Sequence, residues 1–320
     1  MIDGFVLCLF ASIFVAWLAP WIGEGQGPFS LHQIAEYGIQ GIFLSYGITL
    51  GFGKIIRGLV NWRLHLAIHL GTFVIFPLVV LCAYGLLASE SAQMLWIGIV
   101  YVGTLPSTVS SSVTMVSLAR GNVPAAIFNA GISSLLGVVF TPLWMSLLLM
   151  SGDYEFDFLT SIRGVALIVA LPLVLGMMLN PWLGEWFIRN RKFLRHFDQT
   201  VVLLIVYTSF CESFGGNAFV GIGSLTLLLL GSGMLVLFFV VYGILRIVCR
   251  FCRFNREDSI TVLFCGSKKS LMHGTAMATI LFTGTDMSLG VVLLPIMLYH
   301  ALQLLVVSVI ANRYGSRQAA

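Results

Sequence analysis

Residues Leu105 to Asn122 read LPSTVSSSVTMVSLARGN, and this stretch decides how the rest of the chain is interpreted. It lies between apolar segments that belong to a membrane-spanning region, yet it carries a proline and many hydroxyl groups. Pro106 removes a backbone N–H and crowds the carbonyl one turn earlier. Unpaired backbone groups are tolerated at membrane depth only where protein or a wet cavity satisfies them. The stretch therefore predicts a broken helix of the kind at which transporters place their binding sites.

The composition places the chain in a membrane. Of its 320 residues, 58% are hydrophobic and 9% are charged, whereas an ordinary soluble protein has about 25% charged residues. Apolar runs of about 20 residues, the length that a helix needs to cross a bilayer, recur along the whole chain. The alternating pattern of a lipid-facing β-barrel is not seen. We therefore predict an all-α integral membrane protein, with the lipid bilayer and not a nucleic acid as its large partner.

Ten membrane-spanning helices are predicted from the apolar runs. Their ranges are 2–22, 34–53, 64–88, 92–119, 123–150, 159–180, 198–214, 218–248, 259–282 and 288–311. Polar residues interrupt the fourth and the ninth of these spans. An acidic loop at 151–157 separates the fifth span from the sixth, so the chain divides into a first half, 1–150, and a second half, 159–313.

Basic residues give the expected orientation. Most of the 17 Lys and Arg residues lie at one side of the ten spans. They are Lys54, Arg57, Arg63, Arg120, Arg189, Arg191, Lys192, Arg195, Arg246, Arg250, Arg253, Arg256, Arg313 and Arg317. By the positive-inside rule that side is cytoplasmic. Both termini are therefore expected in the cytoplasm.

A second interruption lies in the ninth span, in the stretch FCGSKKSLMHGTAMA from Phe264 to Ala278. Its apolar run is broken by Gly266 and by the pair Lys268 and Lys269. A charge at the bilayer centre costs at least about 2.5 to 3.5 kcal/mol on insertion scales. These lysines therefore need either a partner or a function.

The two interruptions suggest an internal repeat. Each half of the chain has five spans, and in each half the fourth span is the broken one. Because five is an odd number, a second half with the same internal fold must enter the membrane from the opposite face. The sequence therefore predicts two inverted five-helix repeats, whose broken helices tend to meet near the bilayer midplane and form the site.

Hydroxyl groups follow Pro106 at helical spacing. Those that would share one helix face are Ser107, Ser110, Ser111, Thr114 and Ser117. Such a stripe offers donors and acceptors without charge, which suits a desolvated cation or a polar substrate. Small hydroxylated residues also let helices pack closely, so a packing role stays open for each of them. Thr108 and Ser112 lie off the stripe but at the break, where they could pair freed carbonyls.

The remaining candidates lie in the fifth and ninth spans. Asn129 and Ser133 are one turn apart and would share a face, either as part of a site or as an interhelical hydrogen bond. In the ninth span the candidates are Ser267, Lys268, Lys269, Ser270 and His273. The lysines either pair with freed carbonyls or a carboxylate, or make a positive pocket that favours an anion. The only carboxylate expected within a span, Glu212, lies near the outer end of the seventh.

The chain resembles a known family in two stretches above all. They are LPSTVSSSVTMVSLARGNVPAAIFNAGISSLLGVVFTPLW and CGSKKSLMHGTAMA, and they resemble the bile acid:sodium symporter family, in particular its bacterial sodium/bile-acid-cotransporter-like (SBF-like) branch. The resemblance implies ten transmembrane helices in two inverted five-helix repeats, with broken helices 4 and 9 that cross one another. It implies a core domain over 64–150 and 218–311 and a panel domain over 2–53 and 159–214. It also implies transport of an organic anion by alternating access, in a bacterial inner membrane.

The ninth helix departs from the pattern of this family. Better-known members are expected to carry a glutamate and a glutamine there for sodium, whereas this chain has Ser267, Lys268, Lys269 and Ser270. A fixed ammonium could stand where a sodium ion would. Ser110, Ser111 and Ser112 match the general position of the family's cation ligands on helix 4, so a sodium site there stays open. Coupling to Na+, to H+ or to neither ion stays open as well, and no other cofactor is expected.

Together these observations predict a secondary active transporter of a small organic anion. Hydroxyls would be its polar ligands, and Lys268 or Lys269 its fixed charge. The alternative from another class is a non-transporting membrane regulator or scaffold with the same fold. An intramembrane enzyme is not expected, because Ser110 with His273 is the only nucleophile and base that could be paired. The substrate stays open, as does the choice between a monomer and a dimer.

Overall fold

The computed structural model is helical, and no strand occurs among the residues that it describes. These residues are 4–23, 30–50, 61–87, 93–149, 158–216, 218–219, 222–282, 285 and 287–316; the side chains at 85–87, 110, 149, 158 and 161 are outside the description. Some residues used above for the orientation, among them Lys54, Arg57 and Arg317, lie outside the described residues, as does the acidic loop 151–157.

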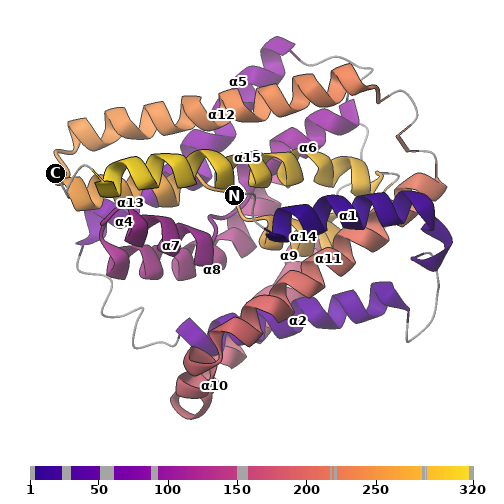
Figure 1. The fold of residues 1–320 in the computed structure, drawn as a ribbon, viewed down its shortest axis with the longest axis horizontal. Helices are drawn as coiled ribbons and strands as arrows, with labels where there is room; N and C mark the ends of the chain where they lie inside the picture. The colour runs from indigo at the N-terminus through magenta and orange to yellow at the C-terminus, as the bar shows by residue number, and fades with distance from the viewer. Residues whose placement is uncertain are drawn as a thin grey trace. The chain divides into compact units, whose positions relative to one another are not determined.

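The chain folds into two compact units, each built from segments that are distant in the sequence (Figure 1). Unit 1 contains Met1–Gly53, Ser146–Ile222 and Met272–Leu294. Unit 2 contains Lys54–Met145, Gly223–Leu271 and Pro295–Ala320. The division into the core and panel domains given above stays a prediction.

Unit 1 is built around the packing of α2 on α10. Its helices are α1 (Gly4–Leu18), η1 (Pro20–Ile22), α2 (Leu31–Leu50), α9 (Phe158–Val165), η5 (Ala166–Ala170), α10 (Leu171–Arg189) and α11 (Arg191–Gly215), with parts of α8 (Val123–Leu149, from Ser146), α14 (Leu271–Leu281, from Met272) and α15 (Leu289–Ser316, to Leu294). Glycines let α2 and α10 approach closely. A Cβ atom on Gly47 would meet the backbone carbonyl of Leu173, and one on Gly176 would meet that of Leu44. A second helix, α11, packs against α1 and α2.

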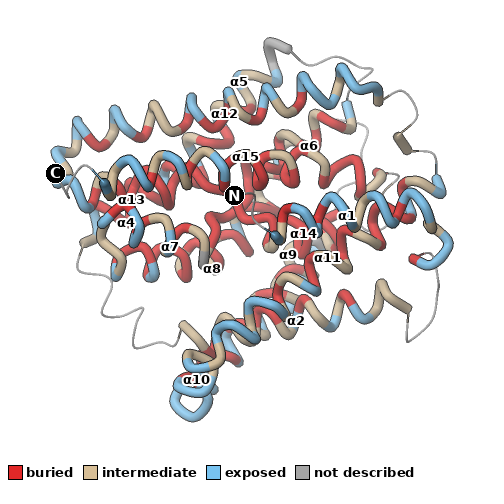
Figure 2. The backbone as a smooth tube through the Cα atoms, in the orientation of Figure 1, coloured by how far each residue is buried: buried red, intermediate tan, exposed pale blue. Residues whose placement is uncertain are grey.

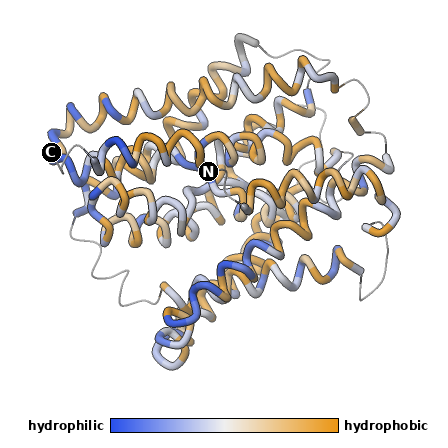
Figure 3. Tube along the Cα trace, viewed as in Figure 1, coloured by the Kyte–Doolittle hydropathy of each residue, from blue (hydrophilic) through white to orange (hydrophobic). Residues whose placement is uncertain are grey.

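A single residue joins α10 to α11. Asn190 ends α10, where its backbone N–H and its side-chain amide both donate to the carbonyl of Trp186, at 3.0 and 2.9 Å. The basic residues of this corner are all exposed; they are Arg189, Arg191, Lys192 and Arg195. Figure 3 shows a hydrophilic patch here, at the end of helices that are otherwise mostly hydrophobic.

Unit 2 is built around α13. Its helices are α4 (Trp62–Leu70), η3 (Gly71–Ile75), α5 (Phe76–Leu87), α6 (Gln93–Thr104), α7 (Ser110–Leu118), α8 (Val123–Leu149, within this unit to Met145), α12 (Ser224–Phe251), α13 (Arg256–Gly266) and the part of α15 (Leu289–Ser316) from Pro295 on. Within this unit α13 packs against α4, α7 and α12. It is buried from Ile260 to Gly266, as the red tube in Figure 2 shows.

The sequence explains where α13 begins. Asn255 is extended, and its side-chain oxygen accepts the backbone N–H of Asp258 at 2.8 Å, which is an N-cap. Glu257 and Asp258 place negative charge in the first turn, where the helix dipole favours it. The helix ends at Gly266, the glycine that interrupts the ninth predicted span.

Five helices in the described part of the chain are long and apolar enough to cross a membrane. They are Trp62–Tyr84, Val123–Leu148, Ile162–Arg189, Ser224–Phe251 and Leu289–Ser316. Two shorter apolar helices are Gly4–Leu18 and Gln93–Thr104. Helix occurs in each of the ten predicted ranges, but the count of ten crossings in two inverted repeats stays a prediction.

Candidate functional site

The first break separates α6 from α7. Residues 105–109 are not helical. Pro106 has no N–H to give, and the carbonyl of Val102, which would receive it, instead accepts the N–H of Leu105 at 3.4 Å. The N–H of Ser107 turns away to the hydroxyl of Ser133 at 2.9 Å. The carbonyl of Gly103, four residues earlier, thereby loses its helical donor.

The second break separates α13 from α14 at residues 267–270. Side chains of α15 hold it. The Tyr299 hydroxyl donates to the carbonyl of Ser267 at 2.6 Å. The Gln303 amide pairs with the backbone of Lys269 on both sides: its oxygen accepts the Lys269 N–H at 2.9 Å, and its nitrogen donates to the Lys269 carbonyl at 2.7 Å. The open backbone at this break is therefore held by side chains.

The two breaks bind each other. The Ser107 hydroxyl donates to the carbonyl of Cys265, in the last turn of α13, at 2.6 Å. In return the Ser270 N–H donates to the carbonyl of Pro106 at 2.9 Å. Each break thus satisfies a backbone carbonyl freed by the other, and all four residues belong to unit 2. The carbonyls freed at the two breaks are therefore satisfied by protein groups, as a membrane-spanning segment would require.

Lys269 is saturated by carbonyls. Its side chain is fully buried, and its ammonium nitrogen lies 2.8 Å from the oxygen of Thr72, 2.6 Å from that of Gly103 and 2.7 Å from that of Leu105. The ring of Phe76 covers it, with the ring centroid 4.1 Å from Nζ. An ammonium has three hydrogens to donate, and each of them has an acceptor. Of the alternatives that the sequence left open, Lys269 follows the one in which a lysine pairs with freed carbonyls.

Lys268 has a different environment, although it is also fully buried. Its ammonium donates to the Ser111 hydroxyl at 2.8 Å, and no second partner for it is recorded among the described residues. The Ser111 hydroxyl donates to that of Thr108 at 2.9 Å, which in turn lies 2.6 Å from the hydroxyl of Ser112. A chain of three hydroxyls therefore ends on an ammonium for which one partner, Ser111, is recorded in the described part of the chain.

The predicted hydroxyl stripe is wrong as a single face. Of its members, Thr114 and Ser117 are exposed, whereas Ser107 is buried at the break. Thr108 and Ser112, which were predicted off the stripe but at the break, are buried there. The reason is that residues 107–109 are not helical, so a helical period counted from Ser107 loses its phase before α7 begins. The side chain of Ser110 is outside the described part, and a cation site at Ser110, Ser111 and Ser112 stays a prediction.

Asn129 and Ser133 lie on α8, and both are buried. Ser133 supports the first break through the N–H of Ser107. Asn129 donates to the carbonyl of Ala125 and lies 2.8 Å from Nδ1 of His65, in α4. Its side-chain oxygen is buried without a recorded partner among the described residues. The structure thus joins Ser133 to the break and Asn129 to a histidine that the sequence did not single out.

His273, the last candidate of the ninth span, belongs to unit 1. Its ring stacks on that of Tyr46, with centroids 6.2 Å apart, and meets the edge of Phe43 at 5.1 Å. Both aromatic residues are in α2. The other candidates described above are in unit 2, and a binding role for His273 stays a prediction.

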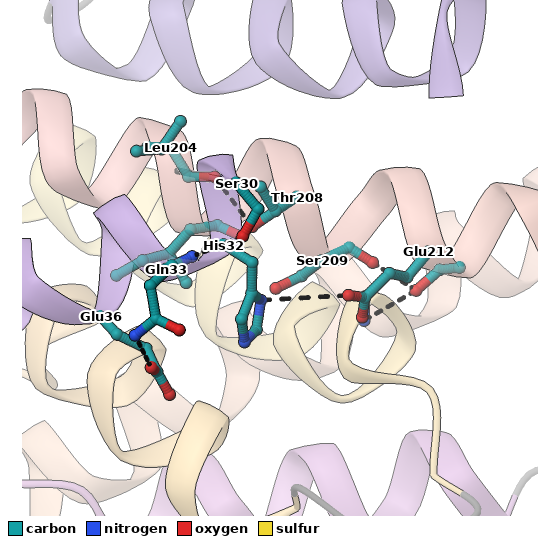
Figure 4. A network of polar contacts seen from close by, with 11 residues as sticks. Ser30, His32, Gln33, Glu36, Leu204, Thr208, Ser209 and Glu212 are labelled. Carbon is teal, nitrogen blue, oxygen red and sulfur yellow. Dashed lines mark hydrogen bonds and ion pairs between the residues drawn. The ribbon is translucent and has the colours of Figure 1, made fainter. Parts of the chain in front are cut away.

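The carboxylate that the sequence placed within a span lies far along the chain from the lysines. Glu212 faces His32, whose Nδ1 is 3.9 Å from a carboxylate oxygen, and nearby Gln33 donates to Glu36 at 2.8 Å (Figure 4). All four residues are in unit 1. Among the described residues, no carboxylate lies within ion-pair distance of Lys268 or Lys269.

Several residues that hold the breaks were missed by the sequence analysis. Thr72 is one, because it acts through its backbone. In the π-helical turn η3 the N–H of Phe76 bonds to Gly71, five residues back, so the carbonyl of Thr72 is left for Lys269. The following Pro77 has no N–H, which frees the carbonyl of Phe73 for the indole N–H of Trp144 at 2.8 Å. Pro77 was the sequence signal available for this distortion. No sequence signal pointed to Gln303 or Tyr299, which hold the second break.

The chain is similar along nearly its whole length to known proteins. A profile of the SBF-like CPA transporter family matches residues 3–316. The putative symporter YfeH of Escherichia coli is 38% identical over 317 residues, which cover 98% of this chain and 93% of that protein. An uncharacterized protein of Pseudomonas aeruginosa is 38% identical over 316 residues, 99% of this chain and 94% of the other. The sodium/bile acid cotransporter 7 of Mus musculus is 30% identical over 311 residues, 96% of this chain and 91% of that protein.

These similarities confirm the resemblance that was drawn from the two interrupted stretches. Similar proteins carry the names of symporters and cotransporters, and the apolar helices described above fit a multi-pass membrane protein. The chain belongs to the SBF-like CPA transporter family.

Proposed function

We propose that this protein is a secondary active transporter of a small organic anion, with Lys268 as the fixed positive charge of its binding site. The observation that carries the proposal is the difference between the two lysines. The ammonium of Lys269 donates its three hydrogens to backbone carbonyls, whereas that of Lys268 has the Ser111 hydroxyl as its recorded partner among the described residues. A carboxylate or sulfate is the ligand class that such an ammonium favours.

The hydroxyls beside Lys268 support an anion with further polar groups. Ser111, Thr108 and Ser112 form one hydrogen-bonded chain, and a hydroxyl can turn its hydrogen to donate or to accept. Such a chain can reorient when an anion replaces one of its internal bonds. Bile-acid-like compounds, sulfated steroids and simple carboxylates are the substrates to compare, since the mouse relative is named for bile acid.

The architecture that we propose is two inverted five-helix repeats with ten membrane crossings. The protein would move its substrate by alternating access. It would lie in a bacterial inner membrane, with both termini in the cytoplasm. Support comes from the two breaks, in α6–α7 and α13–α14, which bind each other through Ser107 and Ser270. Broken helices that meet are typical of the sites of inverted-repeat transporters. The basic corner between α10 and α11 is consistent with a cytoplasmic face.

The proposal includes no requirement for sodium, and it leaves a proton as the alternative coupling ion. Two lysines stand at the second break, and the described carboxylates lie elsewhere. A sodium site at that break would place a cation beside two ammonium groups, which repel it.

The test is anion binding and uptake by the purified chain in proteoliposomes. Uptake of each anion is measured with an inward sodium gradient, with choline in place of sodium, and with a proton gradient. We expect saturable uptake of at least one anion in choline. A chain that binds such anions but moves none of them is a regulator or scaffold, and that result overturns the proposal.

Lys268→Ala tests the site itself. A hydrogen bond to a charged group is worth about 1.5 to 3 kcal/mol, so we expect anion affinity to fall about 10- to 150-fold. Lys268→Arg keeps the charge and should retain part of the affinity. Lys192→Ala removes an exposed positive charge from α11 and serves as the matched control, with affinity near wild type. Wild-type affinity in Lys268→Ala would remove this lysine from the mechanism.

A further inference from the structure

The carbonyl oxygens of Thr72, Gly103 and Leu105 converge on one point that Lys269 fills. We infer that these oxygens, with the ring of Phe76, form a binding site for a small monovalent cation, and that the ammonium of Lys269 is its covalently tethered occupant. This inference does not depend on which anion the protein moves, or on whether it moves one.

Each oxygen of this cage is available because a helix is distorted. The carbonyl of Thr72 is passed over when Phe76 bonds to Gly71 in the π-helical turn. The carbonyl of Gly103 loses its donor when the Ser107 N–H bonds to Ser133. Leu105 lies in the non-helical stretch before α7. Three partial negative charges thus point inward at a place where bulk water cannot solvate them.

The chemistry of the cage fits a monovalent cation. Backbone carbonyls are the ligands with which proteins replace the hydration shell of an alkali ion. An aromatic face within about 6 Å adds attraction for a cation, and here the centroid of Phe76 is 4.1 Å away. The described residues bring no carboxylate, and three neutral dipoles suit a single charge better than a double one.

Gln303 holds the backbone of Lys269, the residue that carries the ammonium. It bonds to both the N–H and the carbonyl of Lys269, at 2.9 and 2.7 Å, so the residue that carries the ammonium is held at its backbone as well as at its tip. A dissolved cation can leave, but a tethered one cannot. The site therefore holds an ammonium whatever the concentration of dissolved cations.

Chemical rescue tests this site. Lys269→Ala removes Cγ, Cδ, Cε and Nζ, and these four atoms are those of propylammonium. Thermal unfolding of the purified full chain in detergent is followed by tryptophan fluorescence in choline chloride, with and without propylammonium chloride at equal ionic strength. Propanol is the neutral probe of the same shape. Lys268→Ala is the matched variant, because it loses the same atoms from a place with one hydroxyl partner.

We expect Lys269→Ala to unfold at a lower temperature than the wild type and to recover in a saturable way with propylammonium. Propanol should give no such recovery, and neither the wild type nor Lys268→Ala should respond to propylammonium in this way. If Lys269→Ala does not fold in choline, the folded yield after purification with each additive is the measure, and equal yields overturn the inference. So does an equal response of Lys269→Ala to propanol and propylammonium.

A second variant tests the cation site without an added ammonium compound. Lys269→Met fills much of the same volume but leaves the carbonyls of Thr72, Gly103 and Leu105 without a cation. It should unfold at a lower temperature than Lys268→Met. A Lys269→Met chain as stable as the wild type would show that the oxygens need no positive charge, and would overturn the inference.

Discussion

The pairing of Gln303 with Lys269 gives a quantitative prediction. Gln303→Met keeps an unbranched side chain of similar length in the buried face of α15 but removes both hydrogen bonds to the Lys269 backbone. The N–H and the carbonyl of Lys269 would then lack those partners. In water-soluble proteins each such loss costs about 1 to 3 kcal/mol, and between membrane helices single bonds average about 0.6 and reach about 1.7 kcal/mol. Two bonds therefore predict a loss of about 1 to 4 kcal/mol.

The assay for this prediction is reversible unfolding in mixed micelles, followed by tryptophan fluorescence. Asn312→Met is the control. Asn312 is an exposed amide on the same helix that donates to the carbonyl of Ser308 at 2.9 Å, and an exposed substitution usually changes stability by less than about 0.5 kcal/mol. A free energy of unfolding for Gln303→Met that equals that of Asn312→Met would refute the view that this amide holds the second break.

Two further substitutions test the packing and the link between the breaks. Gly47→Ala places a Cβ atom against the carbonyl of Leu173 in unit 1, so it should cost about 1 to 3 kcal/mol; Gly231→Ala, which meets nothing within 4 Å, should be neutral or stabilising in the same unfolding measurement. Ser107→Ala removes the hydroxyl that donates to Cys265 but keeps the N–H that bonds to Ser133, so a loss of about 0.5 to 2 kcal/mol is expected. An unchanged unfolding midpoint in Ser107→Ala would mean that this hydrogen bond does not hold the breaks together.

The sequence was sufficient to predict the helical class and both interruptions. The excess of apolar residues requires buried or lipid-facing helices, and Pro106, Gly266 and the paired lysines cannot continue an apolar helix without help. These are local properties, which act wherever the rest of the chain lies. They could therefore be predicted from residue types alone.

The different hydrogen-bond partners of Lys268 and Lys269 could not be predicted in the same way. The partners of Lys269 are backbone oxygens of the turn η3, of α6 and of the non-helical stretch before α7, and a backbone oxygen has no residue type to reveal it. One of them, at Thr72, is available only because the hydrogen-bond pattern shifts by one residue before Pro77. The hydroxyl stripe failed for a related reason, since three non-helical residues after Pro106 change the direction in which every later hydroxyl points.

The mutual bonding of the breaks has a mechanical consequence. Loose segments within a membrane helix are often regarded as hinges, but a hinge needs backbone groups that can exchange partners at small cost. Here the carbonyls of Val102, Gly103, Leu105, Pro106, Cys265 and Ser267 each have a donor. Bending at either break would rupture several of these bonds together. The two breaks, residues 105–109 and 267–270 of unit 2, should therefore shift as one rigid element, and any flexing that admits or releases a solute belongs elsewhere in the chain.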